Sequence, residues 1–256
     1  MLRRFHLPIV SLSLLACAGL AFAEGPVLPL PAADQQRLDA LLGAGVVGKP
    51  LPSAPIDEPR RYFPLQEKSS RYKVTSGKNA GKTQVLGVAK GKRPGGNEAW
   101  RFQLSESLAA FVRNTVEGDL IMPAVTDTGE GVVVITTPAN PFLAKGMKPG
   151  ESRSFTQSVS VNYLDDPTDR DYSGSLSGTY TYLGTFQVTV PAGTYAAVVM
   201  RVACEGKVGP AHTQDMAYYL FAPDVGIVAM VSQEDAEAFW IIHLDSSSGR
   251  VLAAAQ

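Results

Sequence analysis

The sequence contains very little cysteine: only Cys17 and Cys204 among 256 residues. Cys17 lies within the predicted signal peptide described below, so the mature chain keeps a single thiol and cannot form an intramolecular disulfide. Stability must therefore come from an apolar core. A chain of this length buries roughly 70% of the surface that its unfolded form exposes.

No apolar run is long enough to cross a bilayer. The longest, from Leu7 to Leu20, covers fourteen residues, whereas a spanning helix needs about 20. Two arginines precede this run, and Ala21 and Ala23 place small residues at positions −3 and −1 of a cleavage site. The pattern predicts a signal peptide over residues 1–23. The protein is therefore expected to be exported to the periplasm or the extracellular space, with no transmembrane helix in the mature chain.

The same segment has a second interpretation. Leu14-Leu15-Ala16-Cys17 resembles the sequence at which a bacterial lipoprotein is acylated on its first mature cysteine. The residues after Cys17 are apolar, whereas lipoproteins usually continue with polar residues. Cys17 therefore remains an alternative lipidation site, which would make the chain a lipid-anchored envelope protein.

The chain also lacks an excess of charge of either sign. Its formal charge is −1, and removing the two signal-peptide arginines leaves 21 basic and 24 acidic residues, a charge of −3. Proteins that bind nucleic acids carry clustered basic residues. The balance predicts no nucleic-acid partner.

Helical spacing is almost absent and is confined to a proline-rich leader, residues 24–61. Leu38, Leu41 and Leu42 are spaced as i, i+3 and i+4. Asp34 is the expected N-cap, and Gly43 is the expected stop. The leader is predicted to be a tether that carries one short helix, residues 33–42.

From residue 62 onward, alternating apolar residues between turn residues predict β-strands. The predicted strands are 72–74, 83–88, 100–104, 111–116, 119–125, 132–137, 154–163, 186–190, 198–204, 218–221, 227–231, 239–242 and a piece near 251–252, with loops at 138–149 and 165–174. Hairpin-length connections favour antiparallel pairing. The expected fold is mainly β, a single curved antiparallel sheet or half-open β-barrel over residues 62–256.

Two turns are marked by proline and glycine. Pro191 presets φ and Gly193 tolerates a positive φ, which together predict a type I turn with a bulge after strand 186–190. A second turn contains Pro223, Asp224 and Gly226. We expect these residues to have structural roles.

These turns and their flanks resemble an uncharacterised family of bacterial envelope proteins, known only as a domain of unknown function. The family carries Val-Pro-Ala-Gly-Thr-aromatic, found here at residues 190–195, and aromatic-x-Ala-Pro-Gly-Val-Gly-hydrophobic-Val, found at residues 219–228 with Asp224 in place of a glycine. Asp tolerates left-handed geometry better than most residues. Looser matches at residues 62–65 and 141–150 extend the resemblance over residues 62 to about 244. The resemblance implies a curved antiparallel sheet, somewhat like the half-open barrels of outer-membrane lipoprotein carriers, and brings no known activity.

Candidate catalytic residues lack the context that catalysis needs. Cys204 lies on an apolar strand face, which predicts a small core residue. His212 and His243 are the only histidines after the signal peptide, and no Gly-x-Ser-x-Gly elbow accompanies them. A Ser-His-Asp triad assembled from distant residues stays open, because triads are defined by geometry in space.

The acidic loop from Asp165 to Asp171 offers several oxygens to a cation such as calcium. Its spacing does not follow the EF-hand pattern, and Arg170 lies within it. A solvated turn is predicted, and no metal or cofactor site.

The sequence therefore predicts a non-catalytic exported envelope protein. Two kinds of occupant are open: an apolar ligand such as a lipid on the concave face of the sheet, or an envelope protein partner along a strand edge. The alternative is a hydrolase whose triad comes from distant Ser, His and Asp residues. No pattern identifies the ligand-binding residues.

Overall fold

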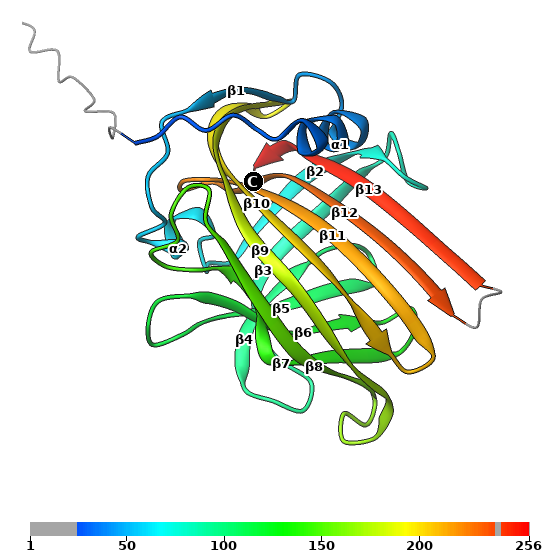
Figure 1. The fold of residues 1–256 in the computed structure, drawn as a ribbon. Helices are drawn as coiled ribbons and strands as arrows, with labels where there is room; N and C mark the ends of the chain where they lie inside the picture. The colour runs from blue at the N-terminus through cyan, green and yellow to red at the C-terminus, as the bar shows by residue number, and fades with distance from the viewer. Residues whose placement is uncertain (1–24, 239–241, 256) are drawn as a thin grey trace, which may run out of the picture.

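The computed structural model describes residues 25–238 and 242–255 (Figure 1). The predicted signal peptide, Cys17 and residues 239–241 of one predicted strand lie outside the described residues. The elements are α1 (Ala32–Leu42), β1 (Val47–Leu51), α2 (Pro59–Tyr62), β2 (Lys68–Ser76), β3 (Thr83–Lys92), β4 (Glu98–Gln103), β5 (Leu108–Asn114), β6 (Leu120–Asp127), β7 (Val132–Leu143), β8 (Ser152–Tyr163), β9 (Arg170–Val190), β10 (Gly193–Val208), β11 (Ala211–Ala222), β12 (Gly226–Ala238) and β13 (Ile242–Ala255).

Strands β2 to β13 form an antiparallel barrel of 12 strands. Each strand pairs with the next one along the chain, and β13 pairs back with β2 to complete the ring. The expected mainly β fold with a curved antiparallel sheet is confirmed. The thirteenth strand, β1, lies outside the ring and pairs with the second half of β9.

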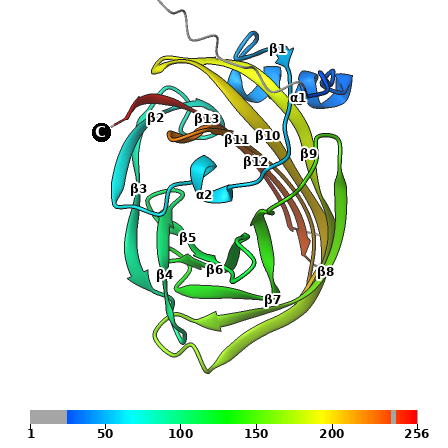
Figure 2. The same ribbon diagram turned by 90° about the vertical axis from the view of Figure 1, so that its left-hand side faces the viewer.

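One end of the barrel interior is filled by aromatic side chains. Phe63 follows α2, which lies in the mouth of the barrel (Figure 2). Its ring makes edge-to-face contacts with Phe102, Phe142 and Phe221, at centroid separations of 5.3, 5.0 and 6.4 Å. Such pairs stabilise a core by about 0.5–1.5 kcal/mol beyond area burial. These rings come from the residue after α2 and from β4, β7 and β11, and they tie opposite walls together.

Helix α1 packs on the outside of the barrel and contacts β12, β13 and β2. Leu38 and Leu42 are buried, as the i, i+4 spacing of their shared face requires. The helix approaches the sheet most closely at Gly249, where a Cβ would come within 2.1 Å of the Leu41 carbonyl oxygen. Glycine at this position therefore permits the helix to lie directly on the sheet.

The predicted helix is confirmed, but its predicted N-cap is wrong. The N-cap residue is Pro31, and Asp34 lies in the first turn with its side chain buried. Gly43 ends the helix with φ 107°, and its N–H donates to the Asp39 carbonyl. The leader also contains β1 and the start of α2, and both helices contact the barrel. The expected tether is thus in contact with the domain that it precedes.

The strands extend well beyond their predicted bounds. Residues 138–143, predicted as loop, continue β7, and β9 begins within the predicted loop 165–174. His212 lies in β11.

The two proline-glycine turns lie between paired strands. Pro191 and Ala192 connect β9 to β10, and Gly193 has φ 141°. Between β11 and β12, Asp224 adopts the left-handed conformation with φ 64°, and Gly226 has φ 99°. The short polar side chain of Asp224 accounts for its tolerance of this conformation.

Candidate functional site

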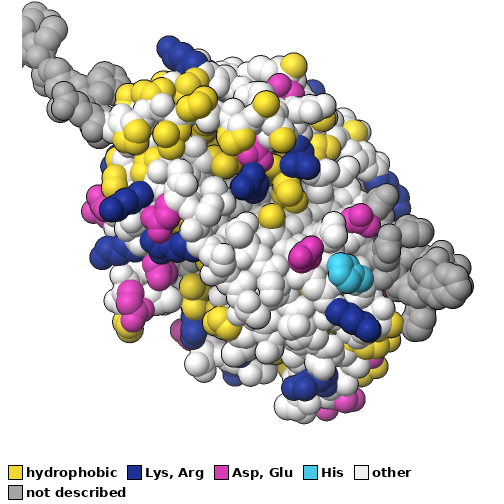
Figure 3. Space-filling view, viewed as in Figure 1, with side chains coloured by type: hydrophobic (Ala, Val, Ile, Leu, Met, Phe, Trp, Pro, Cys, Tyr) yellow, Lys and Arg dark blue, Asp and Glu magenta, His cyan; other side chains and the backbone are white. Residues whose placement is uncertain are grey.

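A groove of about 850 Å³ lies on the outer face of strands β8 to β13, next to α1. Figure 3 views this side of the molecule, where apolar side chains gather towards the α1 end and are sparse over the rest of the face. Antiparallel sheets commonly leave one face to solvent. The groove is the part of that face which α1 does not cover.

Strand register gives the groove a floor of two side-chain rows. One row crosses the sheet as Ser154, Thr179, Ala203, Met216, Gln233 and Ser247. The other row runs Thr156, Ser177, Glu205, Gln214 and Asp235. Most of these side chains end in a hydroxyl, an amide or a carboxylate. The floor can therefore make many hydrogen bonds and offers few apolar contacts.

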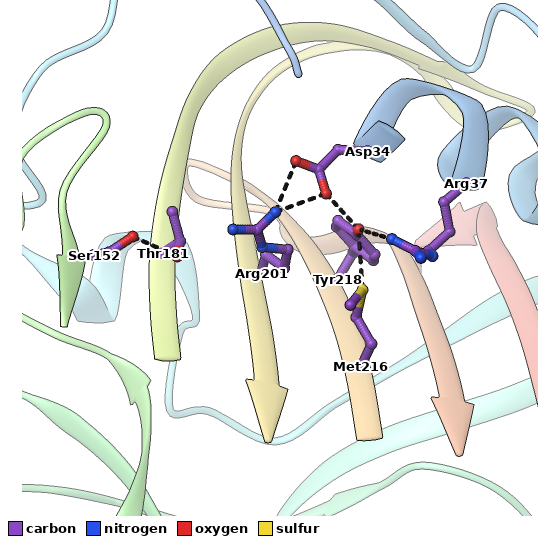
Figure 4. Close-up of polar contacts among 7 residues, drawn as sticks. All are labelled: Asp34, Arg37, Ser152, Thr181, Arg201, Met216 and Tyr218. Atoms are coloured by element: carbon purple, nitrogen blue, oxygen red, sulfur yellow. Dashed lines mark hydrogen bonds and ion pairs between the residues drawn. The ribbon is translucent and has the colours of Figure 1, made fainter. Parts of the chain in front are cut away.

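In the next row towards α1, the side chains form a partly buried polar network (Figure 4). Arg201 Nη1 donates to both carboxylate oxygens of Asp34, at 3.0 and 2.9 Å. The Tyr218 hydroxyl donates to Asp34 Oδ1 at 2.6 Å and accepts from Arg37 Nη1 at 3.2 Å. Burial, together with the hydrogen bond to Asp34, raises the pKa of Tyr218 to about 12. This network fixes α1 on the sheet and forms one wall of the groove.

The groove is more acidic than basic. Its lining contains Glu205, Asp215, Glu234 and Asp235 against Arg37. Glu205 and Asp235 point outward in the floor rows, whereas Asp215 and Glu234 belong to the intervening row that faces the barrel interior. The local field favours a ligand that carries positive charge.

Behind the groove, Cys204 and Asp215 face the barrel interior side by side. The Cys204 Sγ lies 3.9 Å from Asp215 Oδ2. Burial, followed by the Asp215 charge, raises the pKa of Cys204 to about 12. Burial, followed by the Glu234 charge, raises the pKa of Asp215 to about 6. A nucleophilic cysteine needs a lowered pKa, so these surroundings suit an unreactive thiol.

The two histidines are not brought into a triad by the described contacts. His212 is exposed on β11, and its side chain makes no hydrogen bond or ion pair within the described residues. The backbone of His243 pairs with Glu237 in the β12–β13 ladder, and its side chain lies outside the described residues.

In the acidic loop from Asp165 to Asp171, carboxylate oxygens accept hydrogen bonds from residues of the same turn. Asp166 Oδ1 accepts from the backbone N–H and hydroxyl of Thr168, at 3.0 and 2.6 Å. These hydrogen bonds lower the pKa of Asp166. Within residues 25–238 and 242–255, no three His, Cys, Asp or Glu side chains gather in a geometry that could hold a metal ion.

Sequence reasoning did not identify Asp34, Arg201 or Tyr218 as partners. One signal was available, because Asp34 lies four residues before Leu38 and so shares the apolar face of α1. A carboxylate on a buried face needs a cationic or hydrogen-bonding partner. The identity of that partner, 167 residues away, had no local signature.

Comparison with known proteins gives no family assignment. No family model matches the chain, and no curated protein matches it. Among solved structures, a Bacteroides fragilis protein named as exported and as having a YmcC-like fold aligns with 14% identity and a TM-score of 0.40, covering 76% of this chain and 98% of its own. A Parabacteroides distasonis protein named as a lipoprotein aligns with 13% identity and a TM-score of 0.38, with the same coverage. In the part of the chain that is described, no helix has the length and apolar character of a membrane span.

Proposed function

We propose that this chain is an exported envelope protein whose β domain binds and does not catalyse, and that the groove beside α1 binds a polar segment of a partner protein. The predicted signal peptide supports export to the periplasm or the extracellular space. The observation that carries the binding role is the groove itself, which six strands and a helix build from polar side chains.

The groove chemistry favours a protein segment over an apolar ligand. Pockets for small apolar molecules are lined mainly by hydrophobic and aromatic side chains, whereas this floor presents hydroxyl, amide and carboxylate groups. A peptide offers amides and side-chain donors along its whole length, so it matches such a floor. The excess of carboxylates adds a preference for lysine or arginine in the segment.

The concave face of the sheet is less suited to a lipid at its aromatic end. Phe63, Phe142 and Phe221 pack against one another there, and each is almost fully buried. An acyl chain entering this end must displace a packed core. A single lipid adduct in native mass spectra of protein isolated from the envelope would nevertheless replace the partner proposal with the apolar-ligand one.

The hydrolase alternative receives no support from the described contacts. The raised pKa of Cys204 opposes a thiol nucleophile, and no described serine or aspartate hydrogen-bonds to His212. The binding role therefore stands as the proposal.

A matched pair of substitutions tests the groove. Ala203→Trp places a large side chain in the floor, and Ala89→Trp makes the same change at an exposed position on β3, outside the groove lining. A photo-crosslinking amino acid at Gln214 reports on contacts inside the groove in intact cells. We expect crosslinked species in the parent and in the Ala89→Trp variant, and their loss in Ala203→Trp. Equal crosslinking in both tryptophan variants would reject the groove as the binding site.

The same preparations define how the chain is held in the envelope. The denatured mass of the mature protein distinguishes a start at Glu24 from an acylated Cys17. The first result fits an exported soluble chain, and the second fits a lipid anchor.

A further inference from the structure

The barrel wall contains a seam between β7 and β8. The β7–β8 ladder ends at the pair Thr137–Ser158, whereas the β8–β9 ladder continues to Ser152–Thr181. Residues 152–157 are therefore paired on one side only. Beyond Thr137, β7 pairs with β6 alone.

The sequence of β7 explains why its pairing with β8 stops. Pro138 and Pro141 lie in the part of β7 beyond the ladder. Proline has no N–H to donate, so it ends or interrupts a ladder. The prolines of β7 therefore account for the seam, and β8 itself contains no proline.

The hydrogen-bond register shows which groups of β8 face the seam. The Tyr182 N–H donates to the Glu151 carbonyl at 3.0 Å, and bonded pairs recur at every second residue of an antiparallel ladder. Arg153, Phe155 and Gln157 therefore exchange hydrogen bonds with β9. The N–H and C=O groups of the intervening residues point into the seam, namely those of Ser152, Ser154 and Thr156.

This edge lacks the protection that the other free edge has. On β1, Lys49 and Pro50 lie within the strand, and the register shifts between Val47 and Pro50. Lysine, proline and bulges are the usual means of preventing strand addition. The free part of β8 has none of them, and its one cation, Arg153, is held by Glu151 at 2.6 Å.

A buried donor at the end of the seam also lacks a partner. Gln157 is 2% exposed, and its Nε2 has no hydrogen-bond partner within the described residues. A buried donor without an acceptor destabilises the folded chain. A strand that enters the seam brings backbone carbonyl groups, which are the acceptors that such a donor needs.

We propose that residues 152–157 of β8 accept an extended segment of a partner protein as an added strand. A row of alternating N–H and C=O groups is complementary to another extended backbone, so the expected occupant is an extended polypeptide segment. Side chains of the added strand that point outward meet the hydroxyls of Ser152, Ser154 and Thr156, and those that point inward meet Phe155. The segment therefore alternates polar and apolar residues.

A single segment fits the seam better than a second copy of the barrel. An added strand lies about 4.8 Å from β8, whereas a second copy must bring its whole wall against β7 and β8. This interaction uses main-chain groups of β8 and goes beyond the proposed groove, whose floor is made of side chains.

The experiment uses a fluorescent peptide with the sequence of residues 175–181, in which Leu176 and Tyr180 alternate with hydroxyl-bearing residues as the seam requires. Its binding to the full mature protein is followed by anisotropy, with a scrambled peptide as control. Ser154→Pro removes an N–H that faces the seam and leaves the hydrogen bonds to β9 intact. Ser154→Ala removes only the hydroxyl. We expect saturable binding to the parent and to Ser154→Ala, and at least tenfold weaker binding to Ser154→Pro.

Further variants keep the outcomes distinct. Thr156→Pro repeats the test if Ser154→Pro does not fold, as judged by thermal melting. Ser154 and Thr156 border both the groove and the seam, but Ala203 lies two strands away from Ser154. Ala203→Trp is therefore expected to fill the groove and to leave peptide binding at the seam unchanged, so the two proposals can fail separately. Equal binding to the proline and alanine variants, or no binding to the parent, overturns the proposal. A parent dimer that Ser154→Pro converts to a monomer also overturns it, because the edge then pairs with a second copy.

Discussion

Strands β10 to β12 carry two different surfaces on the same outer face. Towards α1, the outward side chains of Leu220, Ala229 and Val231 are completely or almost completely buried. Farther along the strands, Glu205, Gln214 and Asp235 are exposed. The strands do not change direction or pairing between the two surfaces. What differs is whether α1 lies over them.

The boundary is the row that contains Arg201 and Tyr218. These two side chains point outward at the edge of the region that α1 covers. A row of purely apolar side chains there would be exposed to water, whereas a row of purely polar side chains would pack against Leu38 of the helix. Asp34 resolves the conflict by bringing a carboxylate from the helix. The comparison teaches that a continuous strand becomes core or binding surface according to its cover.

The largest effect is expected from breaking the boundary itself. Asp34→Ala leaves the Arg201 guanidinium largely buried without its counterion, and removing one partner of a buried pair costs about 3–5 kcal/mol. Urea unfolding of the mature protein measures the loss. Gln36→Ala, an exposed position on the same helix, serves as control and should change stability by less than about 0.5 kcal/mol. A loss below about 1 kcal/mol for Asp34→Ala would show that α1 is held by its leucines alone.

A smaller loss of stability is expected from a substitution that pushes α1 away from the sheet. Gly249→Ala places a Cβ within 2.1 Å of the Leu41 carbonyl oxygen, so helix or strand must shift, at a cost of about 1–3 kcal/mol. The matched control is Gly87→Ala, where the nearest atom is a backbone oxygen at 3.5 Å. Thermal unfolding should separate the two variants, and equal melting temperatures would contradict close contact between α1 and β13.

A smaller effect again, on the pH dependence of stability, is expected from the inner side of the strands behind the groove. The pKa of Asp215 is raised from 3.8 to about 6, so the folded state binds its proton more tightly than the unfolded state does. Stability should therefore fall by about 1–2 kcal/mol as pH rises from 4 to above 6. Urea midpoints across this range measure the fall, and Asp215→Asn should remove this contribution. An unchanged pH slope in the variant would assign the fall to other groups.

The smallest effect belongs to the groove floor. Ser177 is exposed, and its Oγ lies 3.2 Å from the Thr156 hydroxyl at the surface. Ser177→Ala should change the free energy of unfolding by less than about 0.5 kcal/mol, because water replaces the lost contact. A cost above about 1 kcal/mol would mean that this row supports the fold and is not free for a ligand.

The same contrast explains what the sequence could predict. Strands 154–163 and 186–190 were recognisable because apolar residues alternate along them. The outer parts of β11 and β12, such as residues 211–217 and 232–238, were missed because polar residues occupy both faces there. Their inner rows hold Asp215 and Glu234, and their outer rows form the groove floor. A rule that looks for one apolar face fails where neither face is apolar.

The site was harder to predict than the fold. The spacing of leucines gave the bounds of α1 to within one residue at its start. The function of Asp34 was misread, because a local cap and a distant ion pair use the same residue type. The groove draws side chains from six strands and a helix, and only their register brings them together.

Closure of the ring has a consequence for the order in which the protein folds. Ring neighbours are consecutive in the chain except for β13 and β2, where Ala255 pairs with Ser70. Hairpins with short connections form early, whereas a contact of such long sequence separation forms late. Until β13 pairs with β2, each of these strands has an edge of unpaired backbone groups, the kind of surface on which incompletely folded sheets aggregate. Removal of residues 250–255 should therefore prevent closure of the whole ring, and not merely shorten β13.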